Sequence, residues 1–535
     1  MKAAIASSAW LAAGIPAWLR FNRALAEPAA VQAKILRDVI ARNEDCVFGR
    51  THGFSGIRNY ERFCERVPLS DYPTMEPWIA RIMRGERSVL TTEPVKRLLP
   101  TSGTASGRKL IPFTASFQRE LNAAVGPWIV DIHRRHPGAL SGPMYWSISP
   151  AMPADEIESA VPVGFDDDSA YVGKWRRWFV EGAFAVPSAV RLAGDFEALR
   201  YLTLLCLLRQ RRMSLASVWH PSFLVLLLDA LPAWWDDLVR DVESGCCSRA
   251  GDVPAESRRA FRVPPNPRRA AELRQAGCED AHVLWPELRV VSCWADAQAA
   301  LPAAAVQRRL PHAHIQAKGL LATEAVVTIP FAGRQPVAVT SHFFEFADEH
   351  GELHLAHELQ PGVRYSVIVT TGAGLWRYPL GDCVEVTGFV GRTPSLRFLG
   401  RIGSASDVCG EKLDELFATA AITAACVAFG VSPEFAMLAP EFPHREAPRY
   451  TLFIEPAAPL GIALRIEQEL RRNPHYALCR DLGQLGPVVV CEITRGGHAV
   501  FCKVMNADGQ RLGDIKPQSL SPRSDWRELF GEMPS

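Results

Sequence analysis

The sequence lacks an excess of charge of either sign, and this absence excludes several classes of partner. Its 59 Lys and Arg residues balance 58 Asp and Glu residues, so the formal net charge is +1. A near-neutral chain has no general field that attracts nucleic acid or an anionic membrane. No basic stripe with interleaved aromatics is present either. We therefore expect small-molecule ligands, and neither nucleic acid nor a membrane as partner.

Cys-x-x-Cys pairs are also absent, although the chain contains 13 cysteines. An odd number of cysteines scattered over the whole sequence does not suit a disulfide framework. The pattern favours buried, reduced thiols, and we expect a cytoplasmic protein.

Long hydrophobic runs are missing as well, which excludes an obvious membrane span. The run from Tyr201 to Leu208 is followed at once by basic residues. The first residues imitate a signal peptide, because Lys2 precedes an apolar stretch and Ala24 to Ala26 resembles a cleavage site. However, Arg20 and Arg23 interrupt this stretch, and helical periodicity continues beyond it. The pattern favours an amphipathic helix that docks on the rest of the protein over a signal peptide.

A chain of 535 residues is long enough for two domains. Its pattern predicts an α/β protein whose large first domain, residues 1–402, has β-sheets flanked by helices. Residues 403–535 alternate helices and strands as a small, mobile α+β domain does, and Gly400, Gly403 and Ser404 loosen the joint. Apolar runs predict strands at 288–292, 319–329, 337–341, 365–370, 435–438, 450–455, 488–493 and 499–505, with helices at 411–429 and 460–472.

The stretch from Leu98 to Pro112 has the composition of a phosphate-binding loop. Two apolar, strand-like segments flank a run of hydroxyl and glycine residues that ends in adjacent cations. Glycines let backbone N–H groups converge, hydroxyls add donors and a lysine adds charge. The spacing is not that of a Walker A motif, because three residues separate the glycines and an arginine precedes the lysine. By itself the stretch fits a hydrophilic hairpin turn equally well. The residues concerned are Thr101, Ser102, Gly103, Thr104, Gly107 and Lys109.

Further along, Thr323 and Glu324 close an apolar segment. A single Glu at such a position can hold Mg²⁺ together with substrate phosphates, since magnesium usually takes one or two protein carboxylates. On its own, a capping or salt-bridged Glu is the simpler interpretation.

Three more positions offer groups suited to a nucleotide. Asp382 follows a glycine turn after Tyr378 and is suited to accept hydrogen bonds from both ribose hydroxyls. The alternative is an Asx turn. Arg401 provides a fixed cation at the proposed domain joint, and Lys516 lies in a constrained turn near the end of the chain.

Taken together and in this order, the motifs resemble those of the acyl acid-amido synthetase family of adenylate-forming enzymes. This family is known from plant auxin-responsive promoter proteins and their bacterial relatives. The resemblance covers nearly the whole chain. Matching segments are Thr101 to Lys109 for the phosphate loop, 322–324 for the second motif, Tyr378 to Asp382 for the Tyr-Arg-x-Gly-Asp motif, and 398–401 with 410–412 for the hinge.

The resemblance implies an ATP-dependent ligase with Mg²⁺ as cofactor. A carboxylic acid would be converted to an acyl-adenylate with release of pyrophosphate, and an amine such as an amino acid would displace AMP to form an amide. By resemblance, Lys516 would swing in with the small domain and stabilise the pentavalent phosphorus of the first step, as expected where charge builds on phosphoryl oxygens. The nucleotide would be held by Thr101, Ser102, Gly103, Thr104, Gly107, Lys109, Thr323, Tyr378, Asp382 and Arg401, and Mg²⁺ by Glu324.

The chain departs from the family pattern at two points. Pro379 stands where the third motif usually has arginine, and the tail has Asp514 to Pro517 in place of Gln-x-Lys-x-Pro. Two alternatives stay open: an acyl-CoA ligase that forms a thioester from the same acyl-adenylate, and a non-catalytic relative that binds nucleotide. Trp219, Trp376 and Tyr378 are candidates for the walls of the acid and amine pockets.

Overall fold

The computed structural model describes residues 2–101, 109–147, 158–164, 183–193, 196–248, 264–401, 405–406, 408–444, 446–494, 496–507, 510 and 515–531. Within these ranges no helix has both the length and the hydropathy needed to cross a bilayer.

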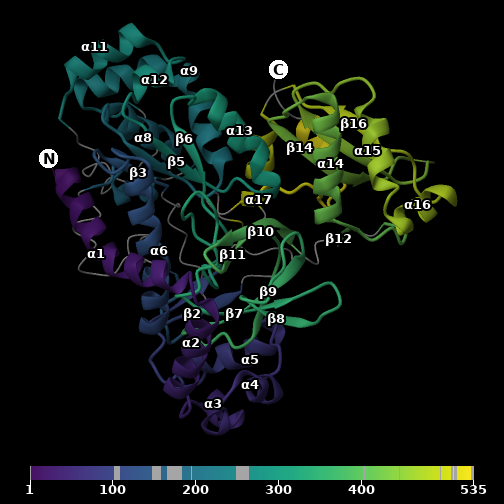
Figure 1. Ribbon diagram of the computed structural model, residues 1–535. Coiled ribbons are helices and arrows are strands. Elements are labelled where there is room, and N and C mark those ends of the chain that lie inside the picture. The colour runs from purple at the N-terminus through teal and green to yellow at the C-terminus, as the bar shows by residue number, and fades with distance from the viewer. Residues whose placement is uncertain are drawn as a thin grey trace.

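The N-terminal helices pack around the bottom and one side of the molecule in Figure 1. Helix α1 is the docking helix expected from the periodicity, and it lies along α6. The two helices cross closely at Gly14 and Gly126, where an added Cβ would come within about 3 Å of the partner helix. These helices are α1 (Lys2–Ala24), α2 (Pro28–Arg42), α3 (Val47–Thr51), α4 (Tyr60–Arg66), α5 (Tyr72–Met83) and α6 (Ala115–Arg135).

The stretch expected to bind phosphate lies between two paired strands. Strand β1 (Arg97–Pro100) pairs antiparallel with β2 (Leu110–Phe113), and the Thr101 N–H donates to the Lys109 carbonyl at 2.9 Å. Both strands are largely buried, so the hairpin is anchored in the core and its loop is held at both ends. Thr114 then caps α6, with its hydroxyl accepting from the Phe117 N–H at 3.1 Å.

A parallel sheet forms the second layer of the large domain. Its order is β3 (Met144–Trp146), β4 (Leu215–Ser217), β5 (Val290–Cys293) and β6 (His314–Ala317). The inner strands β4 and β5 are buried at every position, as expected of parallel strands covered on both faces. The helices around this sheet are α6, α8 (Phe196–Arg209), α9 (Pro221–Ser244), α11 (Pro267–Ala276), α12 (Ala281–Leu284) and α13 (Ala300–Arg309).

An antiparallel sheet of five strands lies between the parallel sheet and α2–α5, as Figure 1 shows. The third motif begins on the inner strand β10, and the start of the hinge lies on the edge strand β11. The strand order is β11 (Thr393–Arg401), β10 (Tyr378–Val390), β9 (Arg364–Thr370), β7 (Phe343–Ala347) and β8 (Leu353–Leu355).

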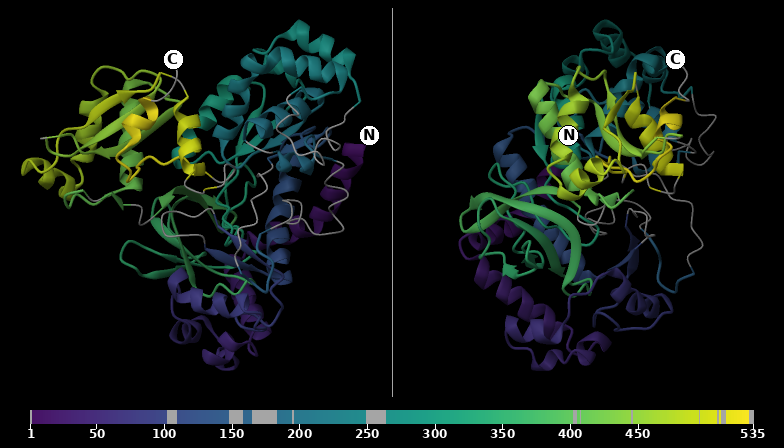
Figure 2. Two further views of the ribbon diagram at one scale, coloured as in Figure 1. Left: turned by 180° about the vertical axis from the view of Figure 1, so that it is seen from behind. Right: turned by 90° about the vertical axis from the view of Figure 1, so that its right-hand side faces the viewer.

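The C-terminal elements gather in a unit of their own beside α13 (Figure 1 and Figure 2). One hydrophobic core lies wholly within this unit, and a second also includes Leu226 of the large domain. The predicted boundary between residues 402 and 403 lies outside the described residues. A three-stranded sheet, β14 (Phe435–Glu441), β15 (Arg449–Glu455) and β16 (Val489–Glu492), is the centre of this unit. The other elements are β12 (Ala405–Ser406), β13 (Leu413–Asp414), α14 (Glu415–Phe429), α15 (Ile462–Leu470), α16 (Pro474–Asp481), α17 (Gly497–Ala507) and α18 (Trp526–Gly531).

Several predicted strands are wrong. The segment predicted as a strand at 499–505 is helix α17, because the Glu455 carboxylate accepts from the N–H groups of Gly496 and Gly497 and caps the helix. The runs at 319–329 and 337–341 make isolated bridges instead of strands, since this segment folds back on itself. Strand β6 is not among the predicted strands.

Candidate active site

The antiparallel sheet brings two of the predicted nucleotide-binding residues face to face. Strands β10 and β11 pair with Asp382 opposite Arg401, and the Arg401 Nε lies 3.3 Å from the Asp382 Oδ1. The Asp382 side chain is buried, whereas the Arg401 side chain is one-third exposed. The pair therefore presents an oriented carboxylate and a partly accessible cation at one end of the sheet.

Glu324 joins this pair from a separate segment. It is buried in a turn that is closed by the bridge between Leu321 and Val326, with the half-buried Thr323 beside it. Burial raises the pKa of Glu324, Arg401 opposes this effect, and Asp382 adds to it. Burial also works to lower the pKa of Arg401, but Asp382 and Glu324 outweigh it and raise that pKa. The three groups are thus close enough to act on one another.

The Glu324 carboxyl fits a hard cation. Among the described residues, no side chain donates a hydrogen bond to it, and burial penalises its charge. A divalent cation would compensate that charge, and Mg²⁺ commonly binds one protein carboxylate together with phosphate oxygens. The buried carboxylate of Glu324 therefore suits its predicted role as a ligand of Mg²⁺.

The hairpin contributes Lys109 to the same cluster. Lys109 opposes the rise in the pKa of Glu324, and its Nζ lies 5.7 Å from the centre of the Tyr72 ring. Tyr72 in turn accepts from the Leu110 N–H at 2.8 Å. Tyr378 is buried in this cluster, and burial followed by the charge of Glu324 raises its phenol pKa. Thr101 and Lys109 mark the ends of the predicted phosphate loop, while Ser102, Gly103, Thr104 and Gly107 lie outside the described residues.

Two buried polar networks hold the site, and neither was predicted from the sequence. In the first, His342 accepts from the Val326 N–H with Nε2 and bonds Glu120 with Nδ1 at 2.8 Å. Glu120 also accepts from the Gly372 N–H. This network ties the turn that carries Glu324 to the loop before β10. A short sequence motif cannot predict this network, because its members are up to 252 residues apart.

The second network anchors the start of β10. Arg377 has a positive φ of 46° and donates from Nε and Nη2 to Glu345, at 3.1 and 2.8 Å, and from Nη1 to the Val67 carbonyl at 2.8 Å. Both side chains are almost fully buried. Arg377 is adjacent to Tyr378, so this ion pair fixes the position in space of the first residue of the third motif. Trp376, a predicted pocket residue, is instead fully buried core and donates to the Leu90 carbonyl.

The buried ion pair of Arg377 and Glu345 leads to a prediction about the stability of the protein. We expect Arg377→Lys to lower the free energy of unfolding by about 2 kcal/mol, because lysine keeps the charge but loses the fork of hydrogen bonds to Glu345 and the backbone. Urea denaturation followed by circular dichroism measures the difference. Arg397→Lys is the matched control, since Arg397 makes a half-exposed ion pair with Glu385. Equal stability of the Arg377→Lys variant and the wild type would contradict the assigned role.

Lys516 contacts a loop of the large domain. Its side chain is exposed, and its Nζ is 4.5 Å from the centre of the Trp294 ring. The pKa of the buried His220 is depressed mainly by burial, then by His498 and Lys516. The loop after Trp294 reaches β11, because the Asp296 carboxylate accepts a hydrogen bond from the Phe398 backbone. Lys516 is therefore seated on the large domain, next to a loop that touches the strand carrying Arg401.

Other contacts also join the C-terminal unit to the large domain. Arg309 of α13 lies 2.7 Å from Asp229 of α9 and 3.5 Å from Glu434 of the C-terminal unit. Leu226 of α9 belongs to a hydrophobic cluster formed otherwise by C-terminal residues. His220 and His498 face each other with ring centres 6.0 Å apart. These contacts define the orientation that places Lys516 on Trp294.

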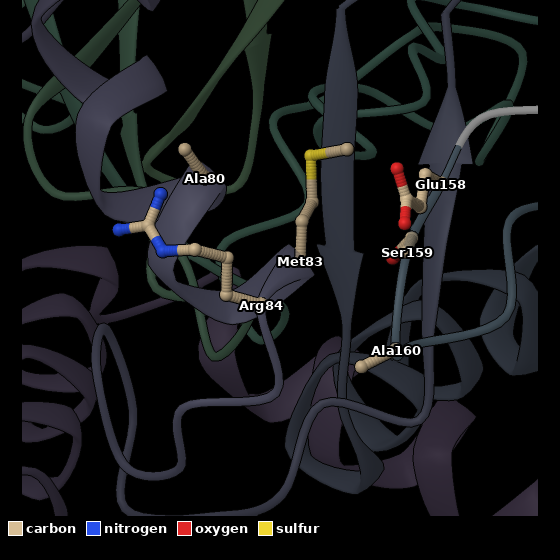
Figure 3. A pocket seen from close by; sticks show the side chains of 6 residues that line it. All are labelled: Ala80, Met83, Arg84, Glu158, Ser159 and Ala160. Atoms are coloured by element: carbon tan, nitrogen blue, oxygen red, sulfur yellow. The ribbon is translucent and has the colours of Figure 1, made fainter.

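A separate pocket of about 690 Å³ lies at the end of α5 (Figure 3). The Arg84 and Glu158 side chains stand on opposite sides of it. It is lined by Ala80, Met83, Arg84, Glu158, Ser159 and Ala160, and it shares no residue with the cluster around Glu324.

Family models match most of the chain in the order of its domains. The GH3 family N-terminal domain matches residues 18–308, the GH3 family central domain 336–401 and the GH3 family C-terminal domain 417–525. The chain belongs to the GH3 family. The predicted resemblance to acyl acid-amido synthetases is thereby confirmed.

Individual GH3 relatives are distant but cover most of the chain. Indole-3-acetic acid-amido synthetase GH3.3 of Arabidopsis thaliana is 24% identical over 440 residues, 75% of this chain and 72% of the relative. Indole-3-acetic acid-amido synthetase GH3.8 of Oryza sativa subsp. indica is 27% identical over 422 residues, 72% of this chain and 68% of the relative.

Solved structures confirm the predicted α/β fold. The AtGH3.15 acyl acid amido synthetase in complex with 2,4-DB matches with a TM-score of 0.82 at 17% identity, over 96% of this chain and 95% of that one. A 2-hydroxyisobutyryl-CoA ligase structure matches with a TM-score of 0.51 at 12% identity, over 95% and 92%. The fold is thus shared by this GH3 protein, an amide-forming enzyme and a thioester-forming enzyme.

Proposed function

We propose that this GH3 protein is an ATP-dependent acid-amido synthetase that adenylates a small carboxylic acid and transfers the acyl group to an amine such as an amino acid. The observation that carries the proposal is the cluster of Glu324, Asp382, Arg401 and Lys109, which brings together two carboxylates, one suited to Mg²⁺ and one suited to ribose hydroxyls, and two cations. The amido synthetase names of the family members support the choice of an amine acceptor.

Each group in the cluster has a task in nucleotide binding. Asp382, oriented by Arg401, accepts hydrogen bonds from the ribose hydroxyls. Lys109, which lies near Glu324, would balance phosphate charge, and Thr101 at the other end of the hairpin loop would offer a hydroxyl donor. Glu324 would hold Mg²⁺, which neutralises phosphate charge when bound. Tyr378 is held in place by the anchored start of β10 and packs beside Glu324.

The first chemical step makes the acyl-adenylate. A carboxylate oxygen of the acid attacks the α-phosphorus of ATP, the bond to the bridging oxygen of the β-phosphate breaks, and pyrophosphate leaves. Negative charge builds on the α-phosphoryl oxygens in the transition state, and preorganised cations stabilise it there. We assign the stabilisation of this charge to Lys516. We place the boundary of the mobile C-terminal domain between residues 402 and 403. The C-terminal unit has a hydrophobic core of its own, which supports a domain able to rotate.

The second step makes the amide. The nitrogen of a neutral amine attacks the acyl carbonyl, the bond from the carbonyl carbon to the phosphate oxygen breaks, and AMP leaves while the nitrogen loses a proton to solvent. We further propose a cytoplasmic location, which the 13 cysteines support because an odd number of scattered cysteines does not suit a disulfide framework.

Pyrophosphate exchange tests the first step and product mass tests the second. The protein is incubated with ATP, Mg²⁺ and a panel of carboxylic acids, and acids that support exchange are then supplied with amino acids or with CoA. We expect an amide and AMP. A thioester without amide would assign the protein to the acyl-CoA ligases, whose fold it shares. ATP binding without exchange for any acid would indicate a non-catalytic relative.

A further inference from the structure

Lys318 is a buried lysine whose charge has no counterion in the described part of the chain. It follows β6 and is 1% exposed. Its Nζ donates to the Ser217 Oγ and to the Val218 carbonyl, both at 2.9 Å. An ammonium has three N–H donors, and no carboxylate among the described residues lies within ion-pair distance of this one. One N–H of the protonated amine therefore has no acceptor among the described residues.

Three tryptophan rings surround the Lys318 ammonium. Their centres lie 4.7 Å away for Trp219, 5.4 Å for Trp146 and 5.7 Å for Trp128. Trp128 is buried and fixed by a hydrogen bond from its Nε1 to the Gln316 side chain. Trp146 and Trp219 are only half-buried. The rings thus form a rigid cage around the cation that is not sealed on the side of these two tryptophans.

The cage adjoins the position of Lys516. The ring of Trp219 lies 6.0 Å from that of Trp294, on which Lys516 sits. The backbones of the two tryptophans are hydrogen-bonded as well. Two lysines therefore flank a pair of neighbouring indole rings, with Lys516 on the side assigned to the phosphate chemistry. Lys318 lies on the other side of the indole pair, and residues 319–323 join it to Glu324.

The charge of Lys318 carries an energetic penalty that a ligand can remove. Burial lowers its pKa to about 7, and the titratable neighbour that opposes this shift is Cys293. The Cys293 thiol is itself neutral, because burial raises its pKa to about 12. Aromatic faces attract a cation but do not neutralise it. If this side chain served only the stability of the fold, a hydrophobic residue of the same length would stabilise it more.

We propose that Lys318 and its three tryptophans form the far end of the acyl-acid site. They select acids that carry a second anionic oxygen at the end remote from the carboxyl group to be activated, a dicarboxylate being the simplest. This inference rests on the acid-activating function proposed above. The activated carboxyl points toward Lys516, the body of the acid packs on Trp219 and Trp294, and the second carboxylate accepts the available N–H of Lys318.

Direct binding measurements test the proposal without relying on catalysis. Dicarboxylates of increasing chain length, and monocarboxylates of the same lengths, are titrated into the full-length protein while tryptophan fluorescence is followed. We expect the wild type to bind the best dicarboxylate at least about tenfold more tightly than its matched monocarboxylate, as one charged hydrogen bond allows. Lys318→Met should remove this preference and leave monocarboxylate binding unchanged. Lys34→Met, at an exposed lysine, should change neither.

The pH dependence gives a second readout that a structural lysine would not show. The protonated amine binds the anion, so dicarboxylate affinity should fall as pH rises through about 7, while monocarboxylate affinity stays flat. Equal wild-type affinity for both acids, or an equal loss of both in a folded Lys318→Met variant, would overturn the proposal. The comparison of the two acids on the wild type decides the matter if the variant fails to fold.

Pyrophosphate exchange separates the proposal from the proposed function. With the same acids, exchange that favours dicarboxylates supports both. Selective, Lys318-dependent binding without exchange would support the acid site and refute the synthetase function. Exchange with monocarboxylates alone would support the function and refute the role of Lys318.

Discussion

Replacement of Lys516 by alanine is expected to slow adenylation by about 1000-fold, while amide formation from a supplied acyl-adenylate falls only slightly. One preorganised cation at the developing phosphoryl charge typically contributes a factor of 100 to 1000 or more. No phosphorus centre reacts in the second step once the adenylate is supplied, so the same charge has less to stabilise there. Lys516 is exposed on the C-terminal unit and is seated on the indole of Trp294.

Two separate assays measure the Lys516 effect. Pyrophosphate exchange reports the first step, and amide formation from a synthetic acyl-adenylate reports the second. Lys503→Ala is the matched control, because Lys503 is an exposed lysine on α17 of the same unit and the charge change is identical. Equal slowing of both steps would argue against the assigned role, and a control as slow as Lys516→Ala would indicate a general effect of charge.

The second large effect is expected at Glu324. Glu324→Gln keeps the size of the side chain and removes the charge that suits a divalent cation, so we expect adenylation to fall by about 100-fold and to require more Mg²⁺. A titration of exchange activity with Mg²⁺ measures both. Glu385→Gln is the control, since Glu385 lies on β10 with Asp382 but pairs with the half-exposed Arg397. An unchanged Mg²⁺ requirement in Glu324→Gln would refute the assignment as metal ligand.

The same substitution should stabilise the protein in the absence of ligands. Burial raises the pKa of Glu324, so the folded state binds its proton more tightly than the unfolded state does. Above the raised pKa the buried charge therefore costs stability, and Glu324→Gln removes that cost. The gain in melting temperature should shrink as pH falls through the raised pKa, because wild-type Glu324 is then neutral. A variant less stable than the wild type at neutral pH would contradict this account.

The sequence by itself determined the family, the α/β fold and the order of the motifs. The hairpin around the predicted phosphate loop, helix α1 and strand β9 follow from local periodicity, which depends on neighbouring residues alone. Asp382 and Arg401 were singled out separately, and the β10–β11 register places them opposite each other. The roles assigned to these residues stay predictions.

Only the tertiary structure decided which long-range partners complete the site. Helix α17 was predicted as a strand because its cap comes from Glu455, 42 residues earlier in the chain. Arg377 and Glu345 form one buried pair across 32 residues, and the cage of Lys318 draws a tryptophan from each of three separate segments. Short apolar runs are compatible with helix or strand, and a buried charge is defined by what surrounds it. Those surroundings exist only once the chain has folded.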